Sequence, residues 1–238
     1  MTSAHTRAGQ RIIITIDGPA GSGKSTVAHG LAERLGLEFL DTGAMYRAAA
    51  LLAIEQGVKP DDGPALAEAV RQAGLAFDWN DDPPRLLMGG RDVSRRIRDM
   101  DVSSIVSIVA AQGEVRAELV RAQRRLGEEH PRLVTEGRDQ GSVVFPDAPL
   151  RFFLVAEVTV RARRRVAQLA ELGSPVDETR VIDDIRERDR IDSTRADGPL
   201  TRPEGAIEID TSNLSIEQVV GRLESIARAE LAGAEFRR

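Results

Sequence analysis

With 238 residues, 41% of them apolar, the chain can form one large α/β domain with an insertion, or two small domains. The absence of cysteine excludes disulfides and thiolate zinc sites, and the three histidines, at positions 5, 29 and 130, lack the spacing of metal ligands. A net charge of −5 argues against bulk nucleic-acid binding, and no apolar run approaches the ~18–20 residues that span a bilayer. We therefore expect a cytoplasmic protein with no nucleic-acid or membrane partner.

The apolar patterns predict strands and helices in alternation. Residues 1–10 are polar and lack the apolar stretch of a secretory signal, so we expect a flexible tail there. Residues 11–17 form a β-branched run typical of a strand buried on both faces. Further strands are expected at 37–41, 132–136, 151–155 and 206–210, and helices at 24–35, 44–56, 102–126, 158–172, 177–192 and 216–231. This order predicts an α/β fold with a five-stranded parallel sheet flanked by helices.

The alternation is interrupted between about residues 60 and 105. Residues 75–79, 85–88 and 89–93 have the pattern of short antiparallel strands, and the first two are joined by a turn at 80–84. We expect this region to be a small antiparallel subdomain inserted into a single domain that spans 11–238.

One short segment is typical of a phosphate-binding loop. Gly-Pro-Ala-Gly-Ser-Gly-Lys-Ser fits G-x-x-x-x-G-K-[ST] and lies between the first expected strand and helix. Glycines let the backbone turn its N–H groups toward phosphate oxygens, and the following helix adds a positive field. Lys24 is expected to reach the β- and γ-phosphates of ATP, and the Ser25 hydroxyl to ligate Mg²⁺. The residues expected to bind the donor are Gly18, Pro19, Ala20, Gly21, Ser22, Gly23, Lys24, Ser25 and Thr26.

The loop indicates a P-loop NTPase fold but no reaction, because kinases, GTPase switches and mechanical ATPases share it. Guanine-specific switches usually use Asn-Lys-x-Asp. That motif cannot occur here, because neither Lys24 nor Lys59, the two lysines of the chain, follows an asparagine. No typical Walker B run is apparent, and Glu136 and Asp210, which both end apolar strands, remain alternatives for the carboxylate near the metal. The sequence favours a kinase.

Polar residues also gather where later strands are expected to end. Thr42 is expected to cap the second helix and Arg47 to hold a second phosphate, although alone they equally fit a plain cap and a surface arginine. Residues 136–139 end the third strand at the same edge of the sheet, where ligands of open α/β folds bind. The arginine-rich run 188–195 also fits a solvated helix face.

Together these segments resemble the bacterial-type cytidylate kinases, P-loop nucleoside monophosphate kinases that phosphorylate CMP and dCMP with ATP. The resemblance covers nearly the whole chain and lies in residues 16–26, 41–47, 90–94, 136–148, 188–200 and 210–219. The string Gly-Arg-Asp-Gln-Gly-Ser-Val-Val-Phe-Pro at 137–146 is far more specific than the phosphate loop. The family also has an inserted subdomain, which shorter nucleoside monophosphate kinases lack.

The resemblance implies a set of substrate contacts. The acceptor phosphate is expected on Thr42, Arg47, Arg138 and Arg188, cytosine on Ser107, Arg116 and Asp139, and the ribose on Asp192 with Arg195 nearby. Catalysis is expected to depend on Lys24, Arg138 and Arg188, with Mg²⁺, in a monomer. The arginine-rich segment at about 189–202 would form a lid, in which Ile191 departs from the charged residue that relatives often carry.

The expected chemistry needs no general base, because the second pKa of a nucleoside monophosphate lies near ~6 and its dianion is the nucleophile. Two alternatives remain open. A P-loop kinase of a small alcohol, such as shikimate-type substrates, or of another monophosphate would fit; the alcohol would need a carboxylate, such as Asp41, to accept its proton. A regulatory module that hydrolyses ATP slowly would need a domain or long linker to receive its signal, and none is apparent.

Overall fold

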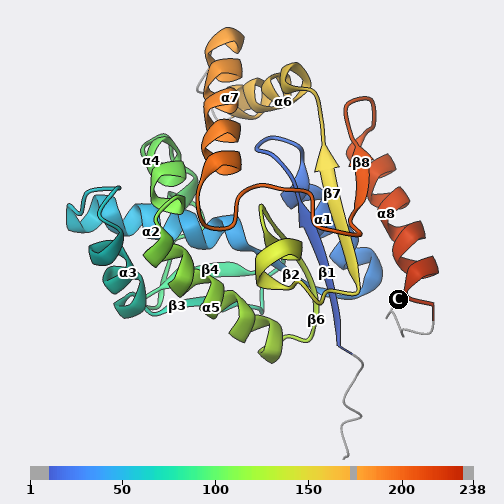
Figure 1. Cartoon of the computed structure of the whole chain (residues 1–238), viewed down its shortest axis with the longest axis horizontal. Coiled ribbons are helices and arrows are strands. Elements are labelled where there is room, and N and C mark those ends of the chain that lie inside the picture. The colour runs from blue at the N-terminus through green and yellow to red at the C-terminus, as the bar shows by residue number, and fades with distance from the viewer. Residues whose placement is uncertain (1–10, 172–175, 233–238) are drawn as a thin grey trace, which may run out of the picture.

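The computed structural model describes residues 11–171 and 176–232, and its centre is a five-stranded sheet in the order β2-β6-β1-β7-β8 (Figure 1). The strands are β1 (Ile12–Asp17), β2 (Glu38–Asp41), β6 (Arg132–Gly137), β7 (Leu150–Val155) and β8 (Ile207–Asp210). Every pairing in this sheet is parallel. The predicted fold class and its five parallel strands are confirmed, whereas the tail expected at residues 1–10 lies outside the described residues.

Strand β1 is apolar throughout because helices cover both faces of the sheet. Ile12, Ile14 and Ile16 pack in one cluster with the apolar stripes of α1 (Lys24–Leu35) and α8 (Ile216–Glu230). Ile13 points to the opposite side and packs in a cluster with Phe145. This alternation follows from the two-residue period of a strand. It leaves the carboxyl end of β1 buried between neighbours, where the phosphate loop begins.

The remaining helices lie to one side of the sheet and above the carboxyl ends of its strands (Figure 1). They are α2 (Thr42–Gln56), α3 (Gly63–Gln72), α4 (Met100–Ala110), α5 (Gly113–Glu129), α6 (Val158–Glu171) and α7 (Glu178–Thr194). Helices α6 and α7 pack on each other through their own small core of Ala162, Val181 and Ile185. No helix within 11–171 and 176–232 is long and apolar enough to cross a membrane.

The predicted antiparallel strands form a separate sheet of β3 (Leu75–Asp78), β4 (Arg85–Met88) and β5 (Arg91–Asp92), in that order. The turn between β3 and β4 contacts the main body: His29 Nε2 lies 2.5 Å from Asp82 Oδ1, and Trp79 stacks on His130 at 3.9 Å. The sequence analysis missed α3 beside these strands. A start signal was available, because Asp62 accepts from the Ala65 N–H at 3.2 Å and a proline follows in the first turn.

The single helix predicted over residues 102–126 was wrong, because the chain forms two helices there. Helix α4 ends at Ala110, and α5 begins at Gly113 after the extended residue Gln112. Glycine suits the first residue of α5, because a Cβ on Gly113 would lie 2.5 Å from Asp197 Oδ2, in the segment that follows α7. The change of direction brings Ser107 on α4 and Arg116 on α5 into one pocket.

Candidate active site

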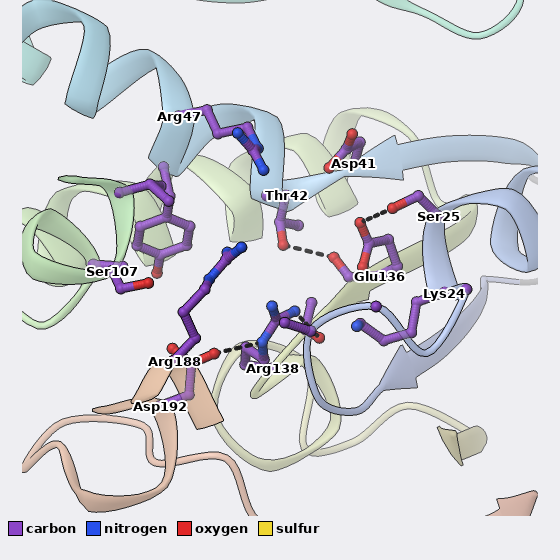
Figure 2. Close-up of a pocket in the computed structure, with 18 of the residues that line it drawn as sticks. Lys24, Ser25, Asp41, Thr42, Arg47, Ser107, Glu136, Arg138, Arg188 and Asp192 are labelled. Carbon is purple, nitrogen blue, oxygen red and sulfur yellow. Dashed lines mark hydrogen bonds and ion pairs between the residues drawn. The ribbon is translucent and has the colours of Figure 1, made fainter. Parts of the chain in front are cut away.

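A cavity of about 550 Å³ lies at the carboxyl ends of the parallel strands, between the phosphate loop, α2, α4, α5, α6 and α7. Of the predicted site residues, those that line it are Ala20, Gly21, Gly23, Lys24, Ser25, Thr26, Thr42, Arg47, Ser107, Arg116, Arg138, Asp139, Arg188, Asp192 and Arg195. Figure 2 shows how several of them point toward one another from different elements. The lining does not include Gly18, Pro19 and Ser22 of the same loop, in which Ser22 Oγ donates to the Pro19 carbonyl oxygen at 3.1 Å.

The phosphate loop depends on glycine for both space and conformation. Gly18 has φ +150°, and a Cβ there would lie 2.2 Å from the carbonyl oxygen of Leu154. Gly21 and Gly23 adopt positive φ values of 77° and 87°, a region that other residues rarely enter. Helix α1 begins at Lys24, directly after the loop, so its free N–H groups belong to the wall of the cavity. The loop thus forms an anion cradle.

Lys24 is buried at the base of this cradle. Its Nζ donates to the carbonyl oxygen of Pro19 at 2.8 Å and lies 3.5 Å from Ser22 Oγ. Burial lowers the pKa of Lys24, the nearby Arg138 lowers it further, and Glu136 acts in the opposite direction. An ammonium group held in this way lacks a full set of strong partners, so an anionic phosphate would stabilise its charge.

Of the two carboxylates left open by the sequence, Glu136 faces the cavity. Ser25 Oγ donates to Glu136 Oε1 at 2.7 Å (Figure 2). Burial raises the pKa of Glu136, and the charge of Asp41 adds to this effect. Asp210, by contrast, is exposed and accepts from the Ser212 N–H at 2.8 Å. A hydroxyl and a carboxylate on one wall are hard oxygen donors of the type that Mg²⁺ prefers.

The predicted role of Thr42 as a helix cap was wrong, because the cap is the preceding residue. Asp41 Oδ1 accepts from the Ala44 N–H at 2.9 Å, and Asp41 Oδ2 pairs with Arg98 at 3.1 Å. Asp41 caps better because its carboxylate reaches the free N–H groups of α2 and complements the helix dipole. Thr42 is therefore inside the helix, and its Oγ1 donates to the carbonyl oxygen of Glu136 at 2.6 Å.

Cationic side chains converge on the middle of the cavity from three elements (Figure 2). Arg47 of α2 donates to Ser103 Oγ at 2.9 Å, and Arg188 approaches from α7. The Nε of Arg188 is buried and has no hydrogen-bond partner among the residues that the structure describes. Burial lowers the pKa of Arg188, and the charge of Arg138 lowers it further. Such a cluster favours an anionic ligand.

Arg138, at the end of β6, is held by a carboxylate from the α7 segment. Its Nε donates to Asp192 Oδ2 at 2.8 Å (Figure 2). Burial acts to lower the pKa of Arg138, but the carboxylates of Asp192 and Glu136 outweigh it and raise the pKa overall. The guanidinium group is therefore charged and fixed in direction, as electrostatic stabilisation of a phosphoryl group requires.

The far end of the cavity contains a buried ion pair. Arg116 Nη2 pairs with Asp139 Oδ2, and both side chains are only 3% exposed. The Arg116 guanidinium lies over the Tyr46 ring at 5.5 Å, and Arg195 Nη2 is 3.9 Å from Asp139 Oδ1. Burial raises the pKa of Asp139, whereas Arg116 and Arg195 act to lower it. Arg116 Nη1 is buried without a hydrogen-bond partner in the described residues, so this end offers an unused donor beside a carboxylate.

The turn that carries Arg138 and Asp139 is anchored by a residue that sequence reasoning missed. Asp17, at the end of β1, accepts from the backbone N–H groups of Gln140 and Gly141, each at 2.8 Å. Burial raises the pKa of Asp17 to about 6, although these two hydrogen bonds act to lower it. Its position directly before the loop glycine was the available signal.

Sequence reasoning also missed Arg98, Arg164 and Arg165, which line the cavity. Arg164 and Arg165 belong to a run of arginines on α6, and Arg164 donates to Thr211 Oγ1 at 3.1 Å. All but two of the 33 lysine and arginine residues of the chain are arginines. In a chain of this composition, local sequence patterns do not distinguish an arginine of the site from an arginine on the surface.

Comparisons with known proteins agree with this geometry. A family model described as cytidylate kinase matches residues 14–229. The chain is 43% identical to the cytidylate kinase of Mycobacterium leprae (strain Br4923), over 91% of this chain and 96% of that protein. It is 48% identical to the bifunctional pantoate ligase/cytidylate kinase of Synechocystis sp. over 87% of this chain, but spans only 41% of that protein's length. A solved structure, an uncharacterized protein from Eubacterium ventriosum, has a TM-score of 0.51 at 13% identity, over 92% of this chain and 99% of that one, which indicates a shared fold alone.

Proposed function

The chain belongs to the cytidylate kinase family, and we propose on this basis that it transfers the γ-phosphate of ATP to CMP or dCMP, giving ADP and CDP or dCDP. One observation carries the proposal: a single cavity joins an anion cradle, a group of arginines and the buried Arg116–Asp139 pair. The cradle suits the phosphates of the donor, and the arginines suit two anions that approach each other. The ion pair suits a base that has both a donor and an acceptor on its edge.

In this proposal the acceptor is its own nucleophile, because its phosphate is a dianion at neutral pH and attacks the γ-phosphorus without loss of a proton. The chain supplies position and charge. Lys24 and the loop N–H groups hold the donor phosphates, while Arg138 and Arg188 stabilise charge on the transferred group. Thr42 and Arg47 hold the acceptor phosphate at the start of α2.

At the other end, Ser107, Arg116 and Asp139 bind cytosine, and Asp192 with Arg195 binds the ribose. The unused Nη1 of Arg116 is a donor for N3 or O2 of the base. The carboxylate of Asp139 accepts from the amino group at C4. In support of this order, Figure 2 draws Ser107 on the opposite side of the cavity from Lys24, with Arg138 and Arg188 between them.

The reaction in this family requires a divalent cation with ATP, and the oxygen donors on the cavity wall fit Mg²⁺. Ser25 Oγ and the Glu136 carboxylate, 2.7 Å apart beside Lys24, are the groups that would hold it. When bound, the ion neutralises charge between the β- and γ-phosphates. Glu136 thereby replaces a Walker B aspartate.

The rival kinase of a small alcohol is less compatible with the cavity. That reaction needs a free carboxylate to accept the hydroxyl proton, and Asp41 was the candidate. Asp41 is already engaged by the Ala44 N–H and by Arg98. We also propose that the enzyme acts as a monomer in the cytoplasm.

A coupled assay of ADP release tests the function directly. With ATP and Mg²⁺ present, CMP and dCMP are expected to give the highest kcat/KM among CMP, dCMP, UMP, AMP, GMP and shikimate. A site built to hydrogen-bond one base rejects analogues that leave its polar groups unpaired, by up to ~10⁴–10⁵ in kcat/KM. Turnover of shikimate, or of another monophosphate in preference to CMP, would contradict the proposal.

We further propose that residues of about 189–202 form a lid that closes over both nucleotides. Its side chains Asp192 and Arg195 contact Arg138 and Asp139, two residues to which we assign contacts with the acceptor. Closure would keep water from the γ-phosphate. Amide hydrogen exchange in this segment is expected to be fast in the free enzyme and to slow when CMP and a non-hydrolysable ATP analogue are bound together. Equal protection in both states would count against a lid.

A further inference from the structure

Arg161 of α6 is a buried cation that lies just outside the cavity lining, and it contacts two parts of the site. The side chain is 7% exposed. Its Nη1 donates to the carbonyl oxygen of Ala20 at 2.9 Å, and its Nε donates to that of Ala156 at 3.0 Å. Its Nη2 pairs with Asp189 Oδ2 at 2.7 Å. Each of the three nitrogen atoms of the guanidinium group therefore has a partner.

These partners belong to opposite halves of the site. Ala20 is in the phosphate loop, and a Cβ on the next residue, Gly21, would lie 3.2 Å from Arg161 Cβ. The loop backbone thus packs directly on the arginine stem. Asp189 is on α7, immediately after Arg188 and one turn before Asp192, both of which line the cavity. The side chain of Arg161 connects the donor cradle to the helix that presents the acceptor-binding residues.

We infer that Arg161 is a positioning residue, which through Asp189 fixes α7 relative to the phosphate loop and so couples donor binding to acceptor binding. The inference rests on the proposed function of the cavity. A donor bound in the cradle orders the loop, and the ordered Ala20 carbonyl holds Arg161 in place. Asp189 then holds α7 with Arg188 and Asp192 in register, so the protein loses less conformational freedom when the acceptor binds.

The chemistry of the contact requires arginine. A planar guanidinium donates in three directions at once, whereas the lysine ammonium is a point charge on a flexible stem and cannot satisfy two carbonyls and a carboxylate in this geometry. The contact also requires Asp189, because removing one partner of a buried ion pair leaves a charge without compensation.

The same two helices offer a matched control. Arg163 of α6 pairs with Glu178 of α7 at 3.3 Å, but both side chains are largely exposed, at 71% and 46%. Exposed pairs of this kind contribute little. Glu178→Gln and Asp189→Asn therefore each remove one negative charge from an ion pair between α6 and α7. Only the pair of Asp189 involves an arginine, Arg161, that also contacts the phosphate loop.

The experiment measures the Kd of CMP by calorimetry, with and without a saturating non-hydrolysable ATP analogue and Mg²⁺. In the wild type and in Glu178→Gln the analogue is expected to tighten CMP binding by at least ~5-fold, within the usual range of site coupling. In Asp189→Asn the gain is expected to fall below ~2-fold, and kcat by at least ~10-fold, because the reacting groups are no longer aligned. A merely structural role would lower the Tm of Asp189→Asn but leave the ratio of the two Kd values unchanged.

A second variant, Arg161→Lys, keeps the positive charge and is measured in the same way if Asp189→Asn does not fold. In this variant too, the ATP analogue is expected no longer to tighten the binding of CMP. The inference is overturned if the variant matches Glu178→Gln, or if the wild type shows no coupling. If wild-type enzyme neither binds nor phosphorylates CMP, the proposed function fails instead. The comparison is then repeated with the monophosphate that the enzyme does use.

Discussion

Replacement of Lys24 with alanine is expected to lower kcat for CMP phosphorylation by at least ~10², because a preorganised donor to the transferring phosphoryl group is lost. Lys24 Nζ is held at the base of the cradle by the Pro19 carbonyl oxygen, at 2.8 Å. Its charge is buried beside Arg138, so burial and repulsion both make it depend on an anionic ligand. Steady-state kinetics with saturating ATP and Mg²⁺ measure the loss.

The binding of CMP alone should change little in this variant, since Lys24 faces the donor phosphates. The chain offers a matched control in Lys59, its other lysine, which is exposed. Lys59→Ala is expected to retain the wild-type kcat. If Lys24→Ala turned over at a near-normal rate, the phosphate loop would have no part in the mechanism.

The substitution Asp139→Asn is expected to lower kcat/KM for CMP and to narrow the CMP/UMP ratio by at least ~10-fold, as hydrogen-bond discrimination allows. Cytosine has an amino donor at C4 and an acceptor at N3, whereas uracil has an acceptor and a donor there. Asp139 and Arg116 therefore match cytosine and mismatch uracil, and unpaired buried groups are unfavourable by ~1–3 kcal/mol each. The new amide of the variant can turn and donate to the uracil carbonyl.

An alternative role for Asp139, as the ion-pair partner that orients Arg138, does not agree with the contacts. Arg138 pairs with Asp192 at 2.8 Å, and the ion-pair partners of Asp139 are Arg116 and Arg195. This arrangement supplies a control, because Asp192→Asn removes another buried carboxylate of the same cavity with no contact to the base. Asp192→Asn is expected to reduce kcat/KM for CMP and UMP by the same factor. If Asp139→Asn also reduced both equally, its carboxylate would be structural and the base would be read elsewhere.

The phosphate loop and the base-binding pair differ in how well the sequence alone predicts them. The phosphate loop is local: its glycines, Lys24 and Ser25 lie within eight residues, and their backbone conformations follow from residue type. The base-reading pair is not local. Arg116 and Asp139 are 23 positions apart, and the family resemblance rather than any pattern of spacing suggested that they act together.

Local patterns determined the five parallel strands, the helices that follow them and the phosphate loop. Periodicity of apolar residues decides which faces are buried, and a short β-branched run such as Ile12–Asp17 is typical of a central strand that is buried on both faces. Tertiary structure decided what local patterns cannot specify. The helix expected at 102–126 is interrupted after Ala110, and α5 begins at Gly113, beside Asp197 of the segment that follows α7.

The family resemblance pointed to five arginines of the site, but tertiary structure decided which residues hold them and which further arginines lie beside them. Arg161 and Ala20 are 141 positions apart, and Arg138 and Asp192 are 54 apart, so folding alone brings each pair together. A long side chain with a charged end is compatible with a surface, an ion pair or a phosphate site, and its role depends on what packs around it. In a chain so rich in arginine, local patterns therefore specified the cradle, whereas only the fold added Arg98, Arg164 and Arg165 to the arginines that the family resemblance had indicated.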